Sequence, residues 1–241
     1  MDIPDGGKTN TTHWSMILSA ADPASPDHQA ALADLCQAYW YPVYSLVRRR
    51  GIARSEAEEL TQEFFLRVLE KNYLQAADPQ KGRFRTFLLV CVKRFLANEW
   101  DRRHAQKRGG GKSPLSLDFQ AAEDRCRIEP ADTLTPDQVF DRRWALTLLE
   151  RVLESLGAEM SATGKQSQFE TLKVYLTGEE HGPPYSQTAD ELQMTVGAAK
   201  VAVHRLRRRF GDLVRAEVAR TVASAEDVDE EVRSLLAILC T

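Results

Sequence analysis

Apolar residues recur every three or four positions along most of the chain, which is the spacing of one face of an α-helix. The apolar stripes predict helices near Thr12, over 28–50, from Ser55, over 83–103, from Thr135, over 167–176, 186–192 and 195–222, and over 227–239. Strand-like alternation of apolar and polar residues is absent, and clusters of β-branched residues are rare. The pattern therefore predicts an all-α protein.

A change in composition divides these helices into two small domains. The glycines of Lys107-Arg108-Gly109-Gly110-Gly111-Lys112 interrupt the periodicity, which resumes at about Leu134 with Thr135-Pro136-Asp137-Gln138, a strong helix start. We expect five parts: an N-terminal extension with a short helix (1–27), a helical domain (28–106), a flexible linker (107–134), a second helical domain (135–222) and an acidic helical tail (223–241).

The tail carries an apolar stripe of its own, at positions 228, 232, 235, 236 and 239. We expect this stripe to pack against the second domain. An alternative, which we favour less, is that the tail's acidic residues screen the basic helix of that domain as an internal brake.

The composition excludes several classes of protein. No apolar run approaches the roughly 20 residues that span a bilayer, and the polar start of the chain is unlike a signal peptide, so we expect a cytoplasmic protein. The four cysteines form no CxxC pair and the five histidines are scattered, so we expect neither a metal site nor a cofactor.

Positive charge is concentrated in two blocks, although the chain as a whole has a net charge of −3. Residues 81–112 hold ten Lys and Arg against two acids, and residues 200–220 hold seven against two. One such block is typical of a solvated helix face. Two blocks, each in a helical segment with aromatic residues, favour contact with a polyanion such as nucleic acid.

The second block lies on a predicted pair of helices, 186–192 and 195–222, which are joined by a turn at Gln193-Met194-Thr195. Thr195 can cap the second of these helices. A short helix, a tight turn and a basic second helix form the layout that places a recognition helix in the major groove of DNA. An ordinary helical hairpin with a charged face fits the spacing equally well.

The first block interleaves basic residues with aromatic ones. Basic groups can follow phosphates and exposed aromatic rings can stack on unpaired bases. The spacing of Phe84, Phe87 and Phe95 instead favours a place in the core, whereas Asn98 and Trp100 lie further round the helix. We therefore expect the latter two to be the better candidates for contact with bases.

Three segments together resemble the sigma-70 family of bacterial sigma factors. Residues 56–69 resemble its polymerase-binding helix, with Glu59, Leu60, Gln62, Glu63 and Phe65 at matching positions. Residues 83–103, which begin Arg83-Phe-Arg-Thr-Phe-Leu88, resemble the part that reads the minus-ten promoter element. Residues 185–210 resemble the helix-turn-helix that reads the minus-thirty-five element. The small two-domain members of the extracytoplasmic-function type are the most similar.

The resemblance implies a protein that binds core RNA polymerase and promoter DNA without covalent catalysis. The residues implied for polymerase binding are Glu59, Gln62, Glu63, Phe65 and Leu69. Those implied for minus-ten DNA are Arg83, Arg85, Lys93, Arg94, Asn98, Trp100, Arg102 and Arg103. Those implied for minus-thirty-five DNA are Lys200, His204, Arg205, Arg207 and Arg208. An anti-sigma protein is a further candidate partner, and control by the tail or by expression level is equally open.

The recognition helix departs from the family pattern. Alanines occupy positions 198 and 202, where the family has a hydroxyl residue and an arginine, and Gln193 replaces the glycine of the turn. Base preference therefore cannot be carried over. A stand-alone helix-turn-helix regulator is the alternative, although it has no need of the helix at 56–69. An enzyme acting on nucleic acid is disfavoured, because no His, Asp or Cys cluster and no phosphate-binding loop is evident.

Overall fold

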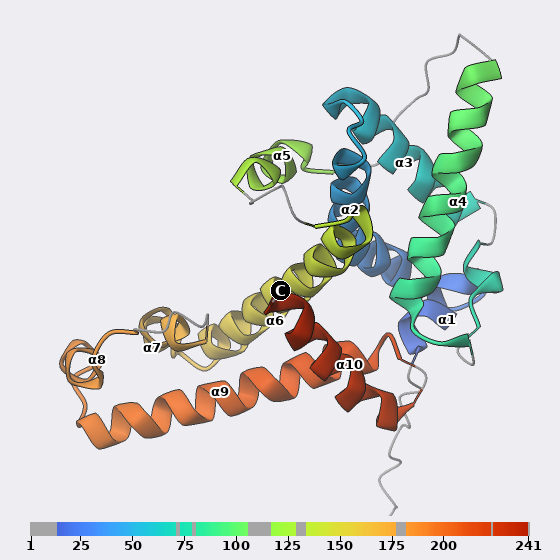
Figure 1. Ribbon diagram of the computed structural model, residues 1–241. Helices are drawn as coiled ribbons and strands as arrows, with labels where there is room; N and C mark the ends of the chain where they lie inside the picture. The colour runs from blue at the N-terminus through green and yellow to red at the C-terminus, as the bar shows by residue number, and fades with distance from the viewer. Residues whose placement is uncertain are drawn as a thin grey trace, which may run out of the picture. The chain divides into compact units, whose positions relative to one another are not determined.

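The computed structural model describes residues 14–70, 73–78, 81–105, 117–128, 134–176, 182–222 and 224–240. Within these ranges the chain forms ten α-helices, two short 3-10 helices and no strand (Figure 1). This confirms the all-α prediction. No helix in the described ranges combines the length and apolar character needed to cross a membrane. The predicted start of the first helix, near Thr12, lies outside them.

Figure 1 labels the α-helices in chain order. The elements are α1 (Ser15–Ala21), α2 (His28–Arg49), α3 (Arg54–Glu70), η1 (Tyr73–Ala76), α4 (Phe84–Ala105), α5 (Phe119–Ile128), α6 (Pro136–Ala162), α7 (Gln166–Leu172), η3 (Lys173–Tyr175), α8 (Tyr185–Glu191), α9 (Val196–Ala219) and α10 (Ala225–Leu239).

Capping residues set several of these boundaries. Gly51, with φ of +78°, follows α2 in the left-handed conformation that favours glycine. At the start of α6, the backbone N–H of Gln138 donates to the Thr135 hydroxyl and the backbone N–H of Thr135 donates to the Gln138 side chain. This reciprocal pair confirms the predicted helix start. Ser224 and Asp227 make the same arrangement at α10.

The helices divide into two compact units. The first unit contains residues 1–144 and 219–241, and the second unit contains residues 145–218. The division differs from the predicted domains in where the acidic tail belongs. We expected α10 to pack against the second domain, whereas it is grouped with the first unit, and its Glu231 pairs with Arg85 of α4.

The core of the first unit is rich in aromatic residues. Trp14, which precedes α1, meets the ring of Phe84 edge-on with 5.8 Å between centroids, and Phe84 also meets Tyr39 at 5.4 Å. All three side chains are fully buried. The residues expected to form an N-terminal extension therefore contribute to the core, and Phe84 and Phe95 are core residues as their spacing predicted.

Residues 119–128, expected to be irregular linker, form α5 and pack on α2. The Phe119 ring lies 5.6 Å from that of Trp40 and 5.2 Å from that of Tyr44. The carboxylate of Glu123 accepts hydrogen bonds from the Tyr44 hydroxyl at 2.6 Å and from two nitrogens of Arg48 at 3.0 and 2.7 Å. The rest of the glycine-rich segment lies outside the described residues.

The core of the second unit brings α6, α7, η3 and α9 together. Its buried members are Leu156, Phe169, Leu172, Tyr175, Val203 and Leu206. Gly157 of α6 allows the close approach of α7, because a Cβ added there would come within 2.9 Å of the Phe169 ring.

Two of the helical glycines, at positions 157 and 197, provide a matched pair of variants. Gly157→Ala should lower the free energy of unfolding by about 1–3 kcal/mol, because the new methyl group overpacks the Phe169 ring. Gly197→Ala should be neutral or stabilising by up to about 1 kcal/mol, because its nearest neighbour is the Thr195 hydroxyl at 4.0 Å. Urea unfolding followed by circular dichroism measures both, and equal effects would contradict the packing described here.

The Glu123 contacts make a pH-dependent contribution to stability. Hydrogen bonds from Arg48 lower the pKa of Glu123 from 4.5 to about 2, against the opposing effect of burial and with help from Tyr44. The charged carboxylate therefore stabilises the folded state fully above pH 4.5, and this contribution is lost as the pH falls towards 2.

We expect Glu123→Gln to cost about 3 kcal/mol of unfolding free energy at pH 7. The difference from the wild type should shrink as the pH falls from 4.5 towards 2. Urea titrations at several pH values, monitored by tryptophan fluorescence to which Trp40 contributes, would measure this difference in the free energy of unfolding. Glu58→Gln, which breaks only a surface pair with Arg54, is the control and should cost less than about 1 kcal/mol. A Glu123→Gln cost that does not vary with pH would count against the assignment.

Candidate nucleic-acid interface

One side of α9 is built into the core of the second unit. Ala199, Val203 and Leu206 are buried at the three- and four-residue spacing of a single helix face. The opposite face is exposed to solvent and carries the basic residues. Its exposed members are Lys200, Val201, His204, Arg205, Arg207, Arg208 and Arg209. The periodicity of α9 therefore turns all five predicted minus-thirty-five residues outward.

The turn between α8 and α9 is held by its backbone. Gln193 has φ of +52°, and its N–H donates to the carbonyl of Asp190. The Met194 N–H donates to the carbonyl of Ala189, and the Thr195 hydroxyl accepts from the N–H of Ala198. The predicted cap at Thr195 is confirmed. The left-handed conformation at Gln193 is one that glycine adopts at lower cost than other residues.

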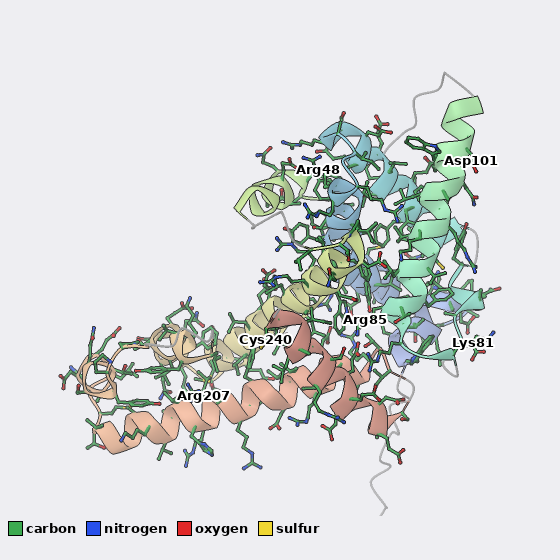
Figure 2. The ribbon with its side chains drawn as sticks, in the orientation of Figure 1. Arg48, Lys81, Arg85, Asp101, Arg207 and Cys240 are labelled. Carbon is green, nitrogen blue, oxygen red and sulfur yellow. The ribbon has the colours of Figure 1, made fainter. Side chains whose placement is uncertain are left out.

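Three of the basic side chains on α9 make contacts within the second unit. Arg207, labelled in Figure 2, donates to the carbonyl of Tyr175 at 3.1 Å. Arg209 makes two hydrogen bonds to Glu159, at 2.8 and 2.6 Å. Lys200 lies 5.8 Å from the centre of the Tyr185 ring. These contacts orient the side chains without burying their charge.

The Tyr185 ring is itself fixed by a stack. It lies parallel to the Tyr175 ring with 5.1 Å between centroids. The Tyr175 hydroxyl donates to the carbonyl of Pro183 and also lies 2.6 Å from the Thr188 hydroxyl. The α8 segment is therefore tied to η3, and through Tyr185 to the first turns of α9.

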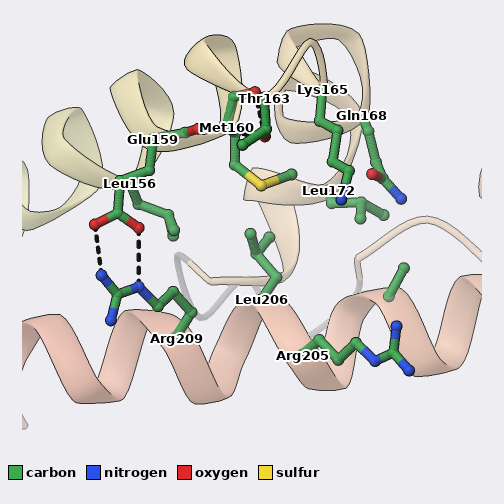
Figure 3. A pocket seen from close by; sticks show the side chains of 11 residues that line it. Leu156, Glu159, Met160, Thr163, Lys165, Gln168, Leu172, Arg205, Leu206 and Arg209 are labelled. Carbon is green, nitrogen blue, oxygen red and sulfur yellow. Dashed lines mark hydrogen bonds and ion pairs between the residues drawn. The ribbon is translucent and has the colours of Figure 1, made fainter.

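A pocket of about 330 Å³ opens beside the basic face of α9 (Figure 3). Its apolar lining comes from Leu156, Met160, Leu172 and Leu206, which also contribute to the core of the second unit. The Glu159–Arg209 pair lies at its edge. We find no cluster of His, Cys, Asp and Glu that could hold a metal ion among the residues that the structure describes.

The first arginines of the other basic block are engaged in an internal network. Arg85 of α4 donates to Glu231 of α10 at 2.6 Å, to Ser234 at 3.0 Å and to Asp141 of α6, and its guanidinium lies 4.8 Å from the Trp144 ring centre. The exposed fractions of Arg85 and Glu231 are 6% and 1%. Figure 2 labels Arg85 within this network.

The neighbouring Arg83 joins the same network. It is paired with Glu231 at 2.8 Å and with the more exposed Glu230 at 2.8 Å. The expectation that Arg83 and Arg85 approach DNA does not fit these contacts, because Arg85 is buried and both guanidiniums are paired with α10. Glu231 and Asp141 were not predicted as partners of Arg85, because no local pattern in the sequence connects them with α4.

Other members of the basic block are distributed along α4. Lys93 pairs with Asp137 of α6, and Arg102 pairs with Glu63 at 3.1 Å and with Glu99 at 2.7 Å. Arg94 and Asn98 are exposed, and Trp100 is 67% exposed. The side chain of Arg103 lies outside the described side chains. The exposed candidates are thus on the second half of the helix.

The α3 candidates differ in their exposure. Glu59 is exposed and Gln62, Glu63 and Leu69 are half-buried, but Phe65 is completely buried and packs edge-on against Phe64 at 5.4 Å. The expectation that Phe65 faces a partner does not fit its place in the core. The Glu63 carboxylate also pairs with Arg67 at 2.7 Å, so it has a structural role as well.

The arginine network predicts a large difference between two adjacent glutamates. Glu231→Ala should lower the free energy of unfolding by about 3–5 kcal/mol, because it leaves Arg85 buried with less compensating charge. Glu230→Ala is the matched control, since Glu230 is largely exposed, and should cost less than about 1 kcal/mol. Urea denaturation gives both values, and a small loss for Glu231→Ala would show that α10 is not required by the first unit.

Comparison with known families gives one match. Residues 29–106, about a third of the chain, match the family model Sigma-70 region 2. The matched segment spans α2, η1, α3 and α4 of the first unit. Searches of curated proteins and of solved structures give no match. The match shows that this part of the first unit is similar to Sigma-70 region 2.

Proposed function

We propose that the protein is a sigma factor that binds core RNA polymerase through α3 and reads promoter DNA with the second half of α4 and with α9. The region 2 match carries this proposal, because it supports polymerase binding and promoter melting by the matched segment. The basic face of α9 adds a second, positively charged surface, which can bind the negative phosphates of a DNA duplex. Neither surface calls for covalent chemistry.

The polymerase-binding surface that we propose consists of Glu59, Gln62, Glu63 and Leu69. These side chains are exposed or half-buried, whereas Phe65 supports the surface from the core side. Gln62 is the residue of this surface best suited to a test by substitution. Glu63 is less suitable, because its carboxylate also holds Arg67 and Arg102.

The minus-ten surface that we propose lies on the second half of α4. Trp100 presents an exposed ring on which an unpaired base can stack, and Arg94 and Asn98 are exposed on the same half of the helix. Arg102 and Lys93 are partly exposed and can exchange their carboxylate partners for phosphates. Arg83 and Arg85 are left out of this surface, because they hold α10.

The minus-thirty-five surface that we propose is the outward face of α9, with Lys200, His204, Arg205, Arg207 and Arg208. All five are exposed, and the stack beneath Tyr185 orients Lys200. We further propose that the protein acts in the cytoplasm as a two-domain factor of the extracytoplasmic-function type. An anti-sigma protein that covers α3 or α9 would be one way to control it.

Gln62→Ala separates polymerase binding from DNA binding. The variant should bind purified core RNA polymerase about three- to tenfold more weakly, because one or two interface hydrogen bonds are lost. Its affinity for duplex DNA should be unchanged. Fluorescence anisotropy of the labelled full-length protein measures both affinities, and Gln37→Ala, an exposed glutamine on α2, is the control.

Three outcomes decide the proposal. A loss confined to polymerase binding supports it, and an equal loss in both assays contradicts the division between α3 and α9. Duplex binding by a wild-type protein that does not associate with core polymerase at all would identify a stand-alone helix-turn-helix regulator instead.

A further inference from the structure

The first two turns of α9 present small apolar residues where polar ones would be expected. Gly197, Ala198 and Val201 are all exposed, and the exposed fraction of Val201 is 49%. Because they are separated by three and four positions, they lie next to one another on the helix surface. We call these three residues the α9 strip.

Packing among the described residues of the second unit does not explain the α9 strip. The buried face of α9 runs through Ala199, Val203 and Leu206, and Val201 lies on the opposite side. Gly197 has an ordinary helical conformation, and a Cβ added to it would meet only the Thr195 hydroxyl, at 4.0 Å. With no side chain at position 197, the backbone of the first turn of α9 is open to the close approach of a ligand.

The charges around the α9 strip indicate what that ligand is. Lys200 lies beside the strip, about 100° round the helix from Val201, whereas Arg205 and Arg208 follow Val201 one and two turns further along the same face. All three are exposed cations. An apolar strip with one cation beside it and two beyond it fits a surface on which negative groups lie close to apolar ones. The major groove of a DNA duplex has this character, with phosphates along its edges.

We propose that the α9 strip reads thymine through its C5 methyl group, an inference that rests on the proposed binding of duplex DNA by α9. No side chain of the strip can donate or accept a hydrogen bond, so the strip cannot distinguish bases by their polar edges. The methyl group of thymine is the feature of the major groove that apolar side chains recognise. Gly197 and Ala198 let the helix come close, and Val201 makes the contact with the methyl group.

Deoxyuridine lacks only this methyl group and therefore tests the proposal. The full-length protein selects duplexes from a random pool, and the tightest one is synthesised with deoxyuridine replacing thymidine at one position at a time. At one or two adjacent positions the wild type should bind about fourfold more weakly, the size expected for one buried methyl group. Val201→Ala should bind the thymidine and deoxyuridine duplexes equally.

Two further variants complete the test. Leu236→Ala removes an exposed apolar side chain from α10 and should retain the fourfold preference. Gly197→Ala should weaken duplex binding severalfold without lowering the free energy of unfolding, because its added methyl group enters the strip. Folding of Val201→Ala is not at risk, since the position is exposed and alanine favours helix.

The possible failures are distinguishable. If no duplex is enriched from the pool, DNA binding itself is contradicted and this inference falls with it. If duplexes are enriched but deoxyuridine has no effect at any position, DNA binding stands and thymine reading is wrong. A preference that persists in Val201→Ala would overturn the role of Val201. Weaker association of Val201→Ala with core polymerase, without any thymine preference, would assign the strip to a protein partner instead.

Discussion

A buried arginine requires a partner for its charge, and in this protein the partner comes from a distant part of the sequence. Arg85 at the start of α4 is enclosed by Glu231 and Ser234 of α10, by Asp141 of α6 and by the Trp144 ring. Removing one member of such a buried set is far more costly than losing a surface pair. The first unit is therefore held together by residues on both sides of the second unit in the sequence.

The pairing of Arg85 with α10 shows that the compact first unit extends beyond the segment that matches region 2. The match ends at residue 106, but the unit that contains it also includes α1, α5, the first turns of α6 and α10. Trp14 packs on Phe84, and α5 is attached to α2 through Glu123. The matched helices thus share their core and their ion pairs with elements outside the matched segment.

The Arg85 network shows which basic residues of α4 have a structural role and which are exposed candidates for binding DNA. A count of basic residues treats Arg83, Arg85 and Arg94 alike, although the first two are paired with α10 and the third is exposed. On α9 the basic residues are not divided in this way, because the helix buries its apolar face and leaves its cations exposed. The proposed DNA contacts consequently fall on the second half of α4 and on the outward face of α9.

Local patterns in the sequence were sufficient for most of the helices and for the caps at Thr135 and Thr195. These features depend on neighbours within four residues, which a sequence displays directly. The pairing of Arg85 with Glu231 depends on contacts across 146 positions, and no local pattern records it. Similarly, the periodicity did not show that Phe65 is buried beside Phe64. The glycine-rich run predicted a flexible linker, although part of that segment forms α5.

The central claim is that this chain brings core RNA polymerase to promoter DNA. Transcription of a premelted promoter fragment by purified core polymerase, with and without the full-length protein, tests it most directly. We expect a discrete transcript that requires the protein, together with a stable complex of the protein and the polymerase in analytical ultracentrifugation. A protein that shows its full helical content by circular dichroism, yet neither sediments with core polymerase nor supports a transcript, would contradict the account.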